Sequence, residues 1–233
     1  MNDPKIIFQD ENIIVVDKPS GWITNDTSTT NGQPTVQTWI RTNHQSPITN
    51  HLEFRDGIVH RLDKETSGIL LVAKTESAFR ELQRQFKERL VKKTYTALVH
   101  GEVKEKEGII NEPVGRLPWR RDRFGVLPDG RLAITSYKVL SRYTIYDIPY
   151  TLLELAPKTG RTHQIRIHLK HIGHPIVGDE FYAGRKTARH DRKWCPRLFL
   201  HASKIIFSDV FSKSEVEFNS PLPPDLTDIL KSI

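Results

Sequence analysis

With 233 residues the chain is long enough for one large domain or two small ones, and its formal net charge of +7 favours a polyanionic partner, most commonly nucleic acid. The single cysteine, Cys195, excludes an internal disulfide and a multi-thiolate metal site. No secretory signal is visible and no apolar run approaches the ~20 residues of a membrane helix, so we expect a cytoplasmic protein without a membrane partner.

The first elements are predicted to form a β-hairpin. Residues 6–8 and 13–16 are short β-prone runs, and the polar residues between them suit a turn. A second turn around Lys18 ends the hairpin, and its residues can be read equally well as structural or functional. Residues 24–50 are rich in Thr, Asn, Gln and Ser. We expect one short helix there, at 36–41, and assign the stretch no function.

A dense polar island with Asp63 at its centre lies between two apolar runs in residues 58–75. The run 69–73 is short and uncharged and predicts a buried strand, and Gly68 before it allows a sharp entry. Asp63 is therefore expected in a loop that leads into a core strand. A rigid scaffold can present a catalytic side chain from such a loop. The alternative is an Asp that only caps a turn.

An amphipathic helix is predicted after this strand, with Thr75 as its N-cap. Its apolar residues recur at near-helical spacing, which predicts a face packed on the sheet: Phe79, Leu82, Phe86 and Leu90. Basic residues at the other positions indicate a solvated face, but the cluster at 87–93 could line an approach for RNA.

Further strands are predicted at 93–101, 133–140 and 150–155. The first of them begins near Tyr95, and a tyrosine in a strand is commonly a half-buried packing residue. Between these strands, residues 108–128 are dominated by turn residues and charges, so we predict a loop. Its arginines and tryptophan suit RNA contact as well as they suit a variable surface insertion.

A helix is predicted after a break at Gly160, with Thr162 as its cap and Gly173 at its end. One face of this helix carries Ile165, Leu169 and Ile172, and Arg166 falls off that stripe. Four histidines lie in the stretch, but they lack the paired i, i+4 imidazoles and nearby carboxylate of a zinc helix: His163, His168, His171 and His174. We therefore reject a metal site.

The segment 185–197 carries six basic residues against one acid and includes Trp194. Such a block is typical of disordered solvated segments, but basic residues beside an aromatic also suit a flap that follows phosphates and stacks on bases. We predict a loop here. A closing strand is expected at 197–203, followed by Pro-rich turns at 220–224 and a short terminal helix.

The order of these motifs resembles that of the RluA-type RNA pseudouridine synthases. The likeness spans most of residues 6–224 and rests on five strings: Lys18-Pro19-Ser20-Gly21, His60-Arg61-Leu62-Asp63 with Thr66-Ser67-Gly68, Lys93-Thr94-Tyr95-Thr96-Ala97, Gly160-Arg161-Thr162-His163-Gln164-Ile165-Arg166-Ile167-His168, and Leu200-His201-Ala202-Ser203. Residues 23–25, Ile-Thr-Asn, depart from the more apolar and often His-containing stretch typical of that family.

The resemblance implies an α+β fold, the pseudouridine synthase catalytic fold. It has a mixed, mostly antiparallel, bent sheet with flanking helices and a central RNA-binding cleft. A single catalytic domain is expected to cover residues 1–233. No N-terminal S4 RNA-binding domain, which many relatives carry, is expected before it.

In this match Asp63 is the essential catalytic residue and Tyr95 is an active-site residue that can stack on the target base. Arg166 pairs with the catalytic carboxylate, which keeps that group ionised and aimed. We hypothesise that Arg61 fills the space that the base leaves. Residues expected to bind the RNA are His60, Arg61, Lys92, Lys93, Arg161, Trp194 and Leu200.

The implied reaction converts a specific uridine of a structured rRNA or tRNA to pseudouridine and needs no cofactor and no metal. Asp63 either attacks C1′ or abstracts the C2′ proton, and the sequence leaves both routes open. We expect a monomer whose partner is RNA. Two other classes of function stay open: a non-catalytic RNA-binding or assembly protein, and a hydrolytic nucleosidase that releases uracil.

Overall fold

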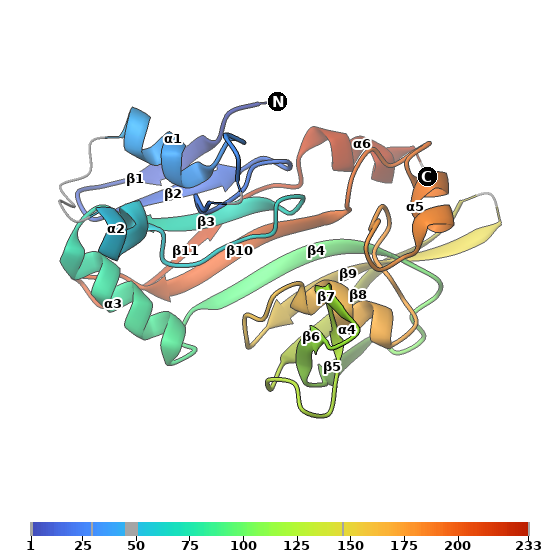
Figure 1. The fold of residues 1–233 in the computed structure, drawn as a ribbon. Helices are drawn as coiled ribbons and strands as arrows, with labels where there is room; N and C mark the ends of the chain where they lie inside the picture. Colours follow the sequence, from blue (N-terminus) through green and yellow to red (C-terminus); the bar gives the residue numbers. More distant parts are fainter. Residues whose placement is uncertain (1, 29, 45–50, 146, 233) are drawn as a thin grey trace. The chain divides into compact units, whose positions relative to one another are not determined.

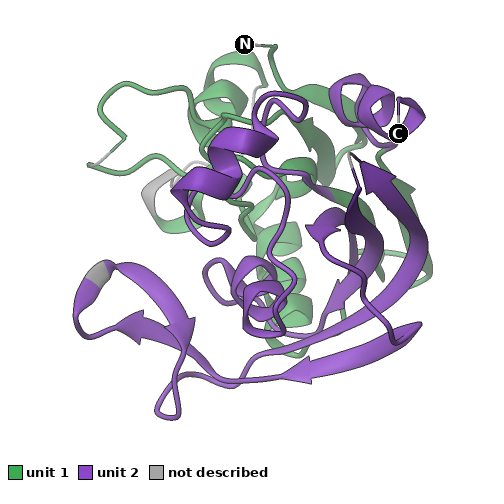
Figure 2. Cartoon of the chain, turned by 90° about the vertical axis from the view of Figure 1, so that its right-hand side faces the viewer, with its two compact units in different colours: residues 1–92, 202–220 green, residues 93–201, 221–233 purple. Residues whose placement is uncertain are grey.

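The computed structural model describes residues 2–28, 30–44, 51–145 and 147–232 (Figure 1). The chain divides into two compact units (Figure 2): unit 1 holds residues 1–92 and 202–220, and unit 2 holds residues 93–201 and 221–233. No helix among the described residues is long and apolar enough to cross a membrane. The expectation of a single catalytic domain stays a prediction.

Unit 1 is built on a sheet with the strand order β1-β2-β3-β10, in which β11 also pairs with β10. The pairs β1 with β2, β2 with β3, and β10 with β11 are antiparallel. The predicted opening hairpin and the buried strand after Asp63 are confirmed, whereas β11 was not predicted and β10 begins later than expected. The strands are β1 (Lys5–Gln9), β2 (Ile13–Lys18), β3 (Ser67–Ala73), β10 (Leu200–Ser208, in unit 1 from residue 202) and β11 (Glu215–Asn219).

The core of unit 1 forms where α3 (Glu76–Lys87) packs on β3, whose seven residues are all buried. The predicted cap is confirmed, because the Thr75 hydroxyl accepts the N–H of Ala78 at 3.2 Å. Phe79 and Leu82 enter the core as predicted. Leu90 does not: the helix ends at Lys87, the chain turns, and the Leu90 side chain is 48% exposed.

A second group of short helices belongs to unit 1. The predicted helix in the polar stretch is confirmed as α1 (Val36–Asn43), which is followed by α2 (His51–Phe54) and the 3-10 helix η1 (Arg55–Gly57). Residues 45–50 of that stretch lie outside the described residues. Asp56 is buried and accepts hydrogen bonds from Gln37 and Arg41, so α1 is tied to the chain just before the Asp63 loop.

Unit 2 contains the strand order β4-β9-β8-β5, and each neighbouring pair is antiparallel. The three predicted strands are confirmed as β4, β8 and β9, and the last two are longer than expected. The mostly antiparallel character of the fold agrees with the expected class. The strands are β4 (Lys92–His100, in unit 2 from residue 93), β5 (Glu107–Asn111), β8 (Ile134–Ile145) and β9 (Ile148–Pro157).

The predicted loop at 108–128 is wrong. Beyond the end of β5, it contains an antiparallel hairpin of β6 (Val114–Leu117) and β7 (Arg120–Val126). Alternate apolar residues of the hairpin face α4: Val114 is buried with Ile167, and Phe124 and Val126 pack against the same cluster. Phe124 and Val126 lie two positions apart, a spacing that is typical of a strand, but the charged residues around them favoured a loop in the sequence.

The helices of unit 2 differ from prediction at their ends. Helix α4 (Gln164–His171) begins after His163, which has φ of +53° and makes no side-chain cap, so Thr162 is not the cap. Helix α5 (Arg185–Asp191) replaces part of the loop predicted at 185–197, and α6 (Pro224–Lys231) is the expected terminal helix. The Gln164 side chain, at the first position of α4, ties the helix to the segment before it by accepting from the Arg161 N–H and the Thr159 hydroxyl.

Candidate active site

Asp63 lies in a turn that leads into β3, as predicted, and is partly exposed. Its carbonyl oxygen accepts the N–H of Thr66 at 3.1 Å, which closes the turn. The following strand begins with Ser67 and Gly68, and both are buried. Asp63 is therefore a partly exposed residue beside the packed core of unit 1.

The turn after β2 is hydrogen-bonded to the residues that follow Asp63. The Lys18 ammonium is fully buried and donates to three carbonyl oxygens, those of Pro19 at 3.1 Å, Trp22 at 2.8 Å and Lys64 at 3.1 Å. Two further bonds come from the same turn, from the Gly21 N–H to the Lys64 carbonyl and from the Ser20 hydroxyl to the Glu65 carbonyl, both at 2.8 Å. The bonds from the Lys18 ammonium are charge-assisted and therefore strong, and together with the two neutral bonds they hold residues 64 and 65 firmly.

Gly68 allows the close approach of two strands of unit 1. Its φ is +110°, and a Cβ at this position would lie 2.2 Å from the carbonyl oxygen of Ala202 in β10. Only glycine fits both the conformation and the space. The predicted sharp entry from the Asp63 loop into β3 thus has a steric cause in the neighbouring strand.

His60 supports the Asp63 loop from the other end. Its Nε2 accepts the backbone N–H of Leu71 in β3 at 2.9 Å, and its ring stacks on Phe86 of α3 with centroids 4.8 Å apart. Because Nε2 accepts, the neutral ring carries its proton on Nδ1. Arg61, next to it, is exposed and adjacent in sequence to Asp63. The RNA-binding roles of both residues stay predictions.

The remaining predicted residue of unit 1, Lys92, is exposed and forms an ion pair with Glu215 of β11 at 2.9 Å. In unit 2, Lys93 and Tyr95 follow on β4, where Tyr95 is buried and pairs in register with Leu155 of β9. Burial lowers the pKa of Lys93 to about 8. The roles expected for these three side chains stay predictions.

Arg166 forms a bidentate ion pair with Asp179, and both side chains are buried. Its Nε donates to Oδ2 and its Nη2 to Oδ1, each at 2.8 Å. The rings of Phe181 and Tyr182 lie against the guanidinium, and Asp179 Oδ1 also accepts the N–H groups of these two residues. Two of the five guanidinium N–H donors thus go to Asp179. The pairing of Arg166 with Asp63 stays a prediction.

Asp179 is a site candidate that the sequence reading missed. It follows Gly178, beyond the end of the Gly160–His168 string, and an acid after a glycine has no distinctive spacing from the arginine thirteen residues earlier. Only the folded chain brings the two side chains together. The signal that identifies Asp179 is structural, a buried and hydrogen-bonded carboxylate beside a predicted functional arginine.

Three other predicted residues of unit 2 have structural contacts. Arg161 Nε donates to the carbonyl of Leu132 at 3.1 Å. Trp194 is half-buried and packs edge-on against Tyr150, with centroids 5.3 Å apart. Leu200 is buried at the start of β10. Their RNA contacts stay predictions.

Three of the four histidines at 163–174 have hydrogen-bond partners within the protein. His163 Nδ1 lies 2.8 Å from the Tyr182 hydroxyl, and His174 Nδ1 lies 2.9 Å from the carbonyl of His100. His168 is fully buried, and burial lowers its pKa. Among the residues that the structure describes, no group of three or more His, Cys, Asp or Glu side chains could hold a metal ion.

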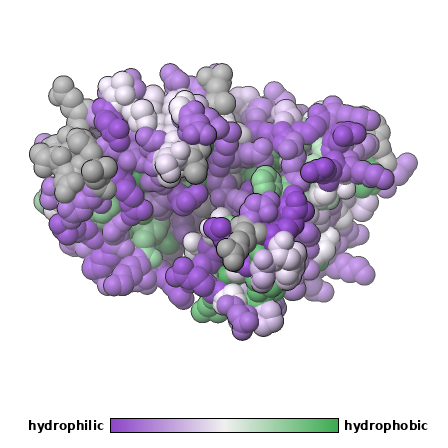
Figure 3. Space-filling model, viewed as in Figure 1, coloured by the Kyte–Doolittle hydropathy of each residue, from purple (hydrophilic) through white to green (hydrophobic). Residues whose placement is uncertain are grey.

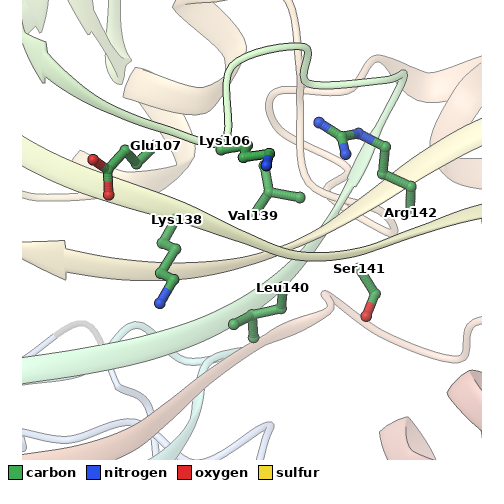
Figure 4. Close-up of a pocket in the computed structure, with 7 residues that line it drawn as sticks. All are labelled: Lys106, Glu107, Lys138, Val139, Leu140, Ser141 and Arg142. Atoms are coloured by element: carbon green, nitrogen blue, oxygen red, sulfur yellow. The ribbon is translucent and has the colours of Figure 1, made fainter.

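Unit 2 also has an open hollow along the edge strand β5 and its neighbour β8 (Figure 4). None of the predicted site residues lines it. Its basic side chains are offset by Glu107, and Arg142 donates to the carbonyls of Val103 and Lys104, which braces the segment before β5. The hollow is lined by Lys106, Glu107, Lys138, Val139, Leu140, Ser141 and Arg142.

The structure thus brings His60 and Asp63 onto one braced segment of unit 1, with Arg61 between them in sequence. In unit 2 it places Arg166 on α4 against Asp179, and Lys93 and Tyr95 on β4. A carboxylate held on a rigid turn can act as a nucleophile or a general base.

Comparisons with known proteins agree with this reading. Residues 12–171 match the family model for RNA pseudouridylate synthase. The ribosomal large subunit pseudouridine synthase D of Nitrosomonas europaea is 40% identical over 98% of this chain and 65% of its own length. An uncharacterised RNA pseudouridine synthase of Chloroflexus aurantiacus is 45% identical over 78% of this chain and 54% of its own. The chain therefore spans about two thirds or less of these two relatives.

Among solved structures, human RNA pseudouridylate synthase domain containing 1 superimposes with a TM-score of 0.75 and 28% identity. That match covers 97% of this chain and 87% of the human one. The fold, the order of the motifs and the extent of the sequence match therefore agree, and the chain belongs to the RNA pseudouridylate synthase family.

Proposed function

We propose that this protein isomerises uridine to pseudouridine in RNA and that Asp63 is its catalytic residue. The observation that carries the proposal is the position of Asp63, a partly exposed carboxylate on a turn braced by the buried Lys18 ammonium. This turn lies inside the span 12–171 that matches the family model. Preorganisation of this kind is what a catalytic group needs.

The reaction breaks the bond between C1′ and N1 of the uridine and forms one between C1′ and C5. N1 gains a proton and C5 loses one, so no atoms are gained or lost and no redox partner is needed. Asp63 starts the reaction by attacking C1′ or by removing the C2′ proton. The target base must first leave its stack, at a cost of about a few kcal/mol that is lowest for an unpaired nucleotide.

Three further residues have proposed roles. Tyr95 stacks on the detached uracil, a contact that in single-strand binders is worth about 1–3 kcal/mol per base, and helps to remove the C5 proton. Arg166 keeps the Asp63 carboxylate ionised and directed. Arg61 fills the space left by the flipped base. The remaining predicted RNA contacts come from basic and aromatic side chains of both units.

The substrate that we propose is large-subunit rRNA, because a relative 40% identical carries the name of a ribosomal large subunit enzyme. A tRNA stem-loop is the second candidate. A non-catalytic RNA-binding role would not require a braced carboxylate. A nucleosidase would use Asp63 equally well but would release free uracil.

The test is to map pseudouridine in total rRNA and tRNA from cells that carry the wild-type gene, a deletion, or Asp63→Ala. We expect at least one pseudouridine to be lost in both the deletion and the Asp63→Ala strain. Loss of more than about 10²-fold in product is expected, because removing a nucleophile or base removes the chemical step. The position of the lost site names the substrate.

Two outcomes contradict parts of the proposal. A site lost in the deletion but kept in Asp63→Ala would show that the carboxylate is not catalytic and would favour a binding role. Release of free uracil from RNA by the purified protein would favour the nucleosidase. Asp63→Asn, which nearly preserves the shape of the side chain, serves as the matched variant for both assays.

A further inference from the structure

The hydroxyl group of Thr24 makes two hydrogen bonds to one residue, Leu62. Thr24 Oγ1 donates to the Leu62 carbonyl oxygen at 2.8 Å and accepts the Leu62 N–H at 3.1 Å. Thr24 is 2% exposed and Leu62 is also buried, so water does not compete for these groups. One side-chain hydroxyl therefore satisfies both backbone groups of Leu62, as the backbone of a neighbouring strand would.

Leu62 directly precedes Asp63, so its carbonyl group lies in the same peptide plane as the Asp63 nitrogen. A fixed Leu62 carbonyl therefore restrains the plane from which Asp63 projects. On the other side, the peptide plane after Asp63 is restrained because the Asp63 carbonyl accepts the Thr66 N–H at 3.1 Å. The next carbonyl, that of Lys64, is held by the turn around Lys18. Asp63 thus lies between two restrained peptide planes, and Thr24 is the side chain that restrains the first.

Thr24 is itself held by the first turn of α1. The N–H of Val36 donates to the Ile23 carbonyl at 2.8 Å, and the N–H of Gln37 donates to the Thr24 carbonyl at 3.1 Å. The first N–H groups of a helix have no partner inside it, so they are available for such contacts. The position of the Thr24 hydroxyl is thus set by a capped helix and not by a flexible loop.

We propose that Thr24 is a positioning residue for the Asp63 carboxylate, an inference that rests on the proposed function of Asp63. Without the hydroxyl, the N–H and carbonyl of Leu62 would be buried without partners, which is costly enough for the loop to rearrange. A displacement of about 1 Å in a reacting group can cost about 10²-fold in rate. The family resemblance assigns no role to residues 23–25, where this sequence departs from the pattern.

The test compares Thr24→Val with Thr24→Ser on the RNA that the mapping identifies. Valine keeps the branched shape but lacks the hydroxyl, and serine keeps the hydroxyl. We expect Thr24→Val to lower kcat by about 10- to 100-fold with KM within about threefold of wild type, because the reacting group moves while the RNA contacts remain. Thr24→Ser is expected to keep kcat within about threefold.

Thr151 offers a matched control in unit 2. It is fully buried, donates to the Gly101 carbonyl at 2.8 Å and accepts the Val103 N–H at 3.0 Å. Like Thr24, it therefore makes one donated and one accepted bond to the backbone, here to two residues that are distant from Asp63 in sequence. Thr151→Val loses the same two bonds. Activity is measured at a temperature where circular dichroism shows each variant to be folded. The kcat of Thr151→Val is expected to stay within about threefold of wild type.

The outcomes of these assays distinguish the positioning role of Thr24 from the proposed function. Equal kcat values for Thr24→Val and Thr151→Val in an active protein would overturn the positioning role and leave the proposed function intact. A wild-type protein that forms no pseudouridine on any RNA would overturn the proposed function and this inference with it. If Thr24→Val does not fold, Thr24→Cys takes its place, because the thiol is of similar size and only a weak donor. Its kcat is then expected to lie below those of Thr24→Ser and Thr151→Val.

Discussion

At the scale of single residues, Arg166 and Asp179 form a buried, bidentate ion pair in unit 2. The two side chains are 4% and 0% exposed, and their two hydrogen bonds are both 2.8 Å long. Removing one partner of such a pair leaves the other charge buried and uncompensated, which costs far more than breaking a surface pair. The pair therefore holds α4 to the turn at residues 178–184.

We predict that Asp179→Asn lowers the free energy of unfolding by about 3–5 kcal/mol, because the amide nitrogen would face the Arg166 Nε–H and the guanidinium charge would stay uncompensated. The measurement is urea unfolding at pH 7. Glu215→Gln is the control: it breaks the Lys92 pair, whose side chains are 66% and 64% exposed, and should cost less than about 1 kcal/mol. Similar losses in both variants would contradict the prediction.

At the scale of elements, α3 is joined to the end of β10 by the side chain of Gln85, which bonds the backbone of Ser208. The Gln85 amide donates to the Ser208 carbonyl at 2.8 Å and accepts the Ser208 N–H at 3.0 Å. Glu81, one turn earlier, accepts from Gln85 and forms an ion pair with Arg84 at 2.9 Å. The hydrogen bond from Arg84 is the main reason that the pKa of Glu81 falls to about 2.

This shift predicts a dependence of stability on pH. The folded pKa of Glu81 is about 2, below the 4.5 of the free side chain, so its contribution is present above pH 4.5 and is lost as the pH falls toward 2. Wild type should exceed Glu81→Gln slightly in unfolding free energy at pH 6, and the difference should shrink between pH 4.5 and 2. Urea unfolding across this range measures it.

The double variant with Arg84→Gln is the control for this prediction. If the hydrogen bond is the cause, the effects of the two substitutions should not add at pH 6. If the difference in unfolding free energy between wild type and Glu81→Gln does not change with pH, the pKa of Glu81 is not lowered by folding and the prediction is wrong.

At the scale of the whole molecule, the positive charge favours RNA. The formal net charge is +7, and the face shown in Figure 3 is covered largely by hydrophilic residues. Binding that neutralises phosphates releases counterions, so affinity falls as salt rises. The net charge by itself predicts that salt weakens binding, but not which lysine and arginine side chains contact phosphate.

We predict that the logarithm of the RNA binding constant falls linearly with the logarithm of the salt concentration, and that Lys93→Gln makes the slope shallower by about 0.7–0.9 at pH 7. At that pH Lys93 is mostly protonated, because its pKa is about 8. Fluorescence anisotropy with the mapped RNA measures both slopes. Lys231→Gln removes an equal charge from α6 and should leave the slope unchanged. An unchanged slope for Lys93→Gln would place that residue outside the phosphate contacts.

Local patterns in the sequence were enough for most elements and for the family. The opening hairpin, the strand after Asp63, the cap at Thr75 and the terminal helix all follow from periodicity, turn residues and capping, which depend on neighbours in sequence. The resemblance that pointed to RNA pseudouridine synthases also rests on short contiguous strings. The local pattern was misleading at 108–128 and 185–197, because charged residues hid a hairpin and a helix whose apolar positions are few.

The contacts that support the candidate site were decided by the tertiary structure. The Thr24 hydroxyl meets Leu62 from 38 residues away, the Lys18 ammonium meets the Lys64 carbonyl from 46, and Arg166 meets Asp179 from 13. A hydroxyl, an ammonium or a carboxylate can hydrogen-bond many partners, so residue type alone does not select one. The sequence by itself determined the family and the candidate site residues, whereas burial and strand packing decided which side chains hold the Asp63 loop in place.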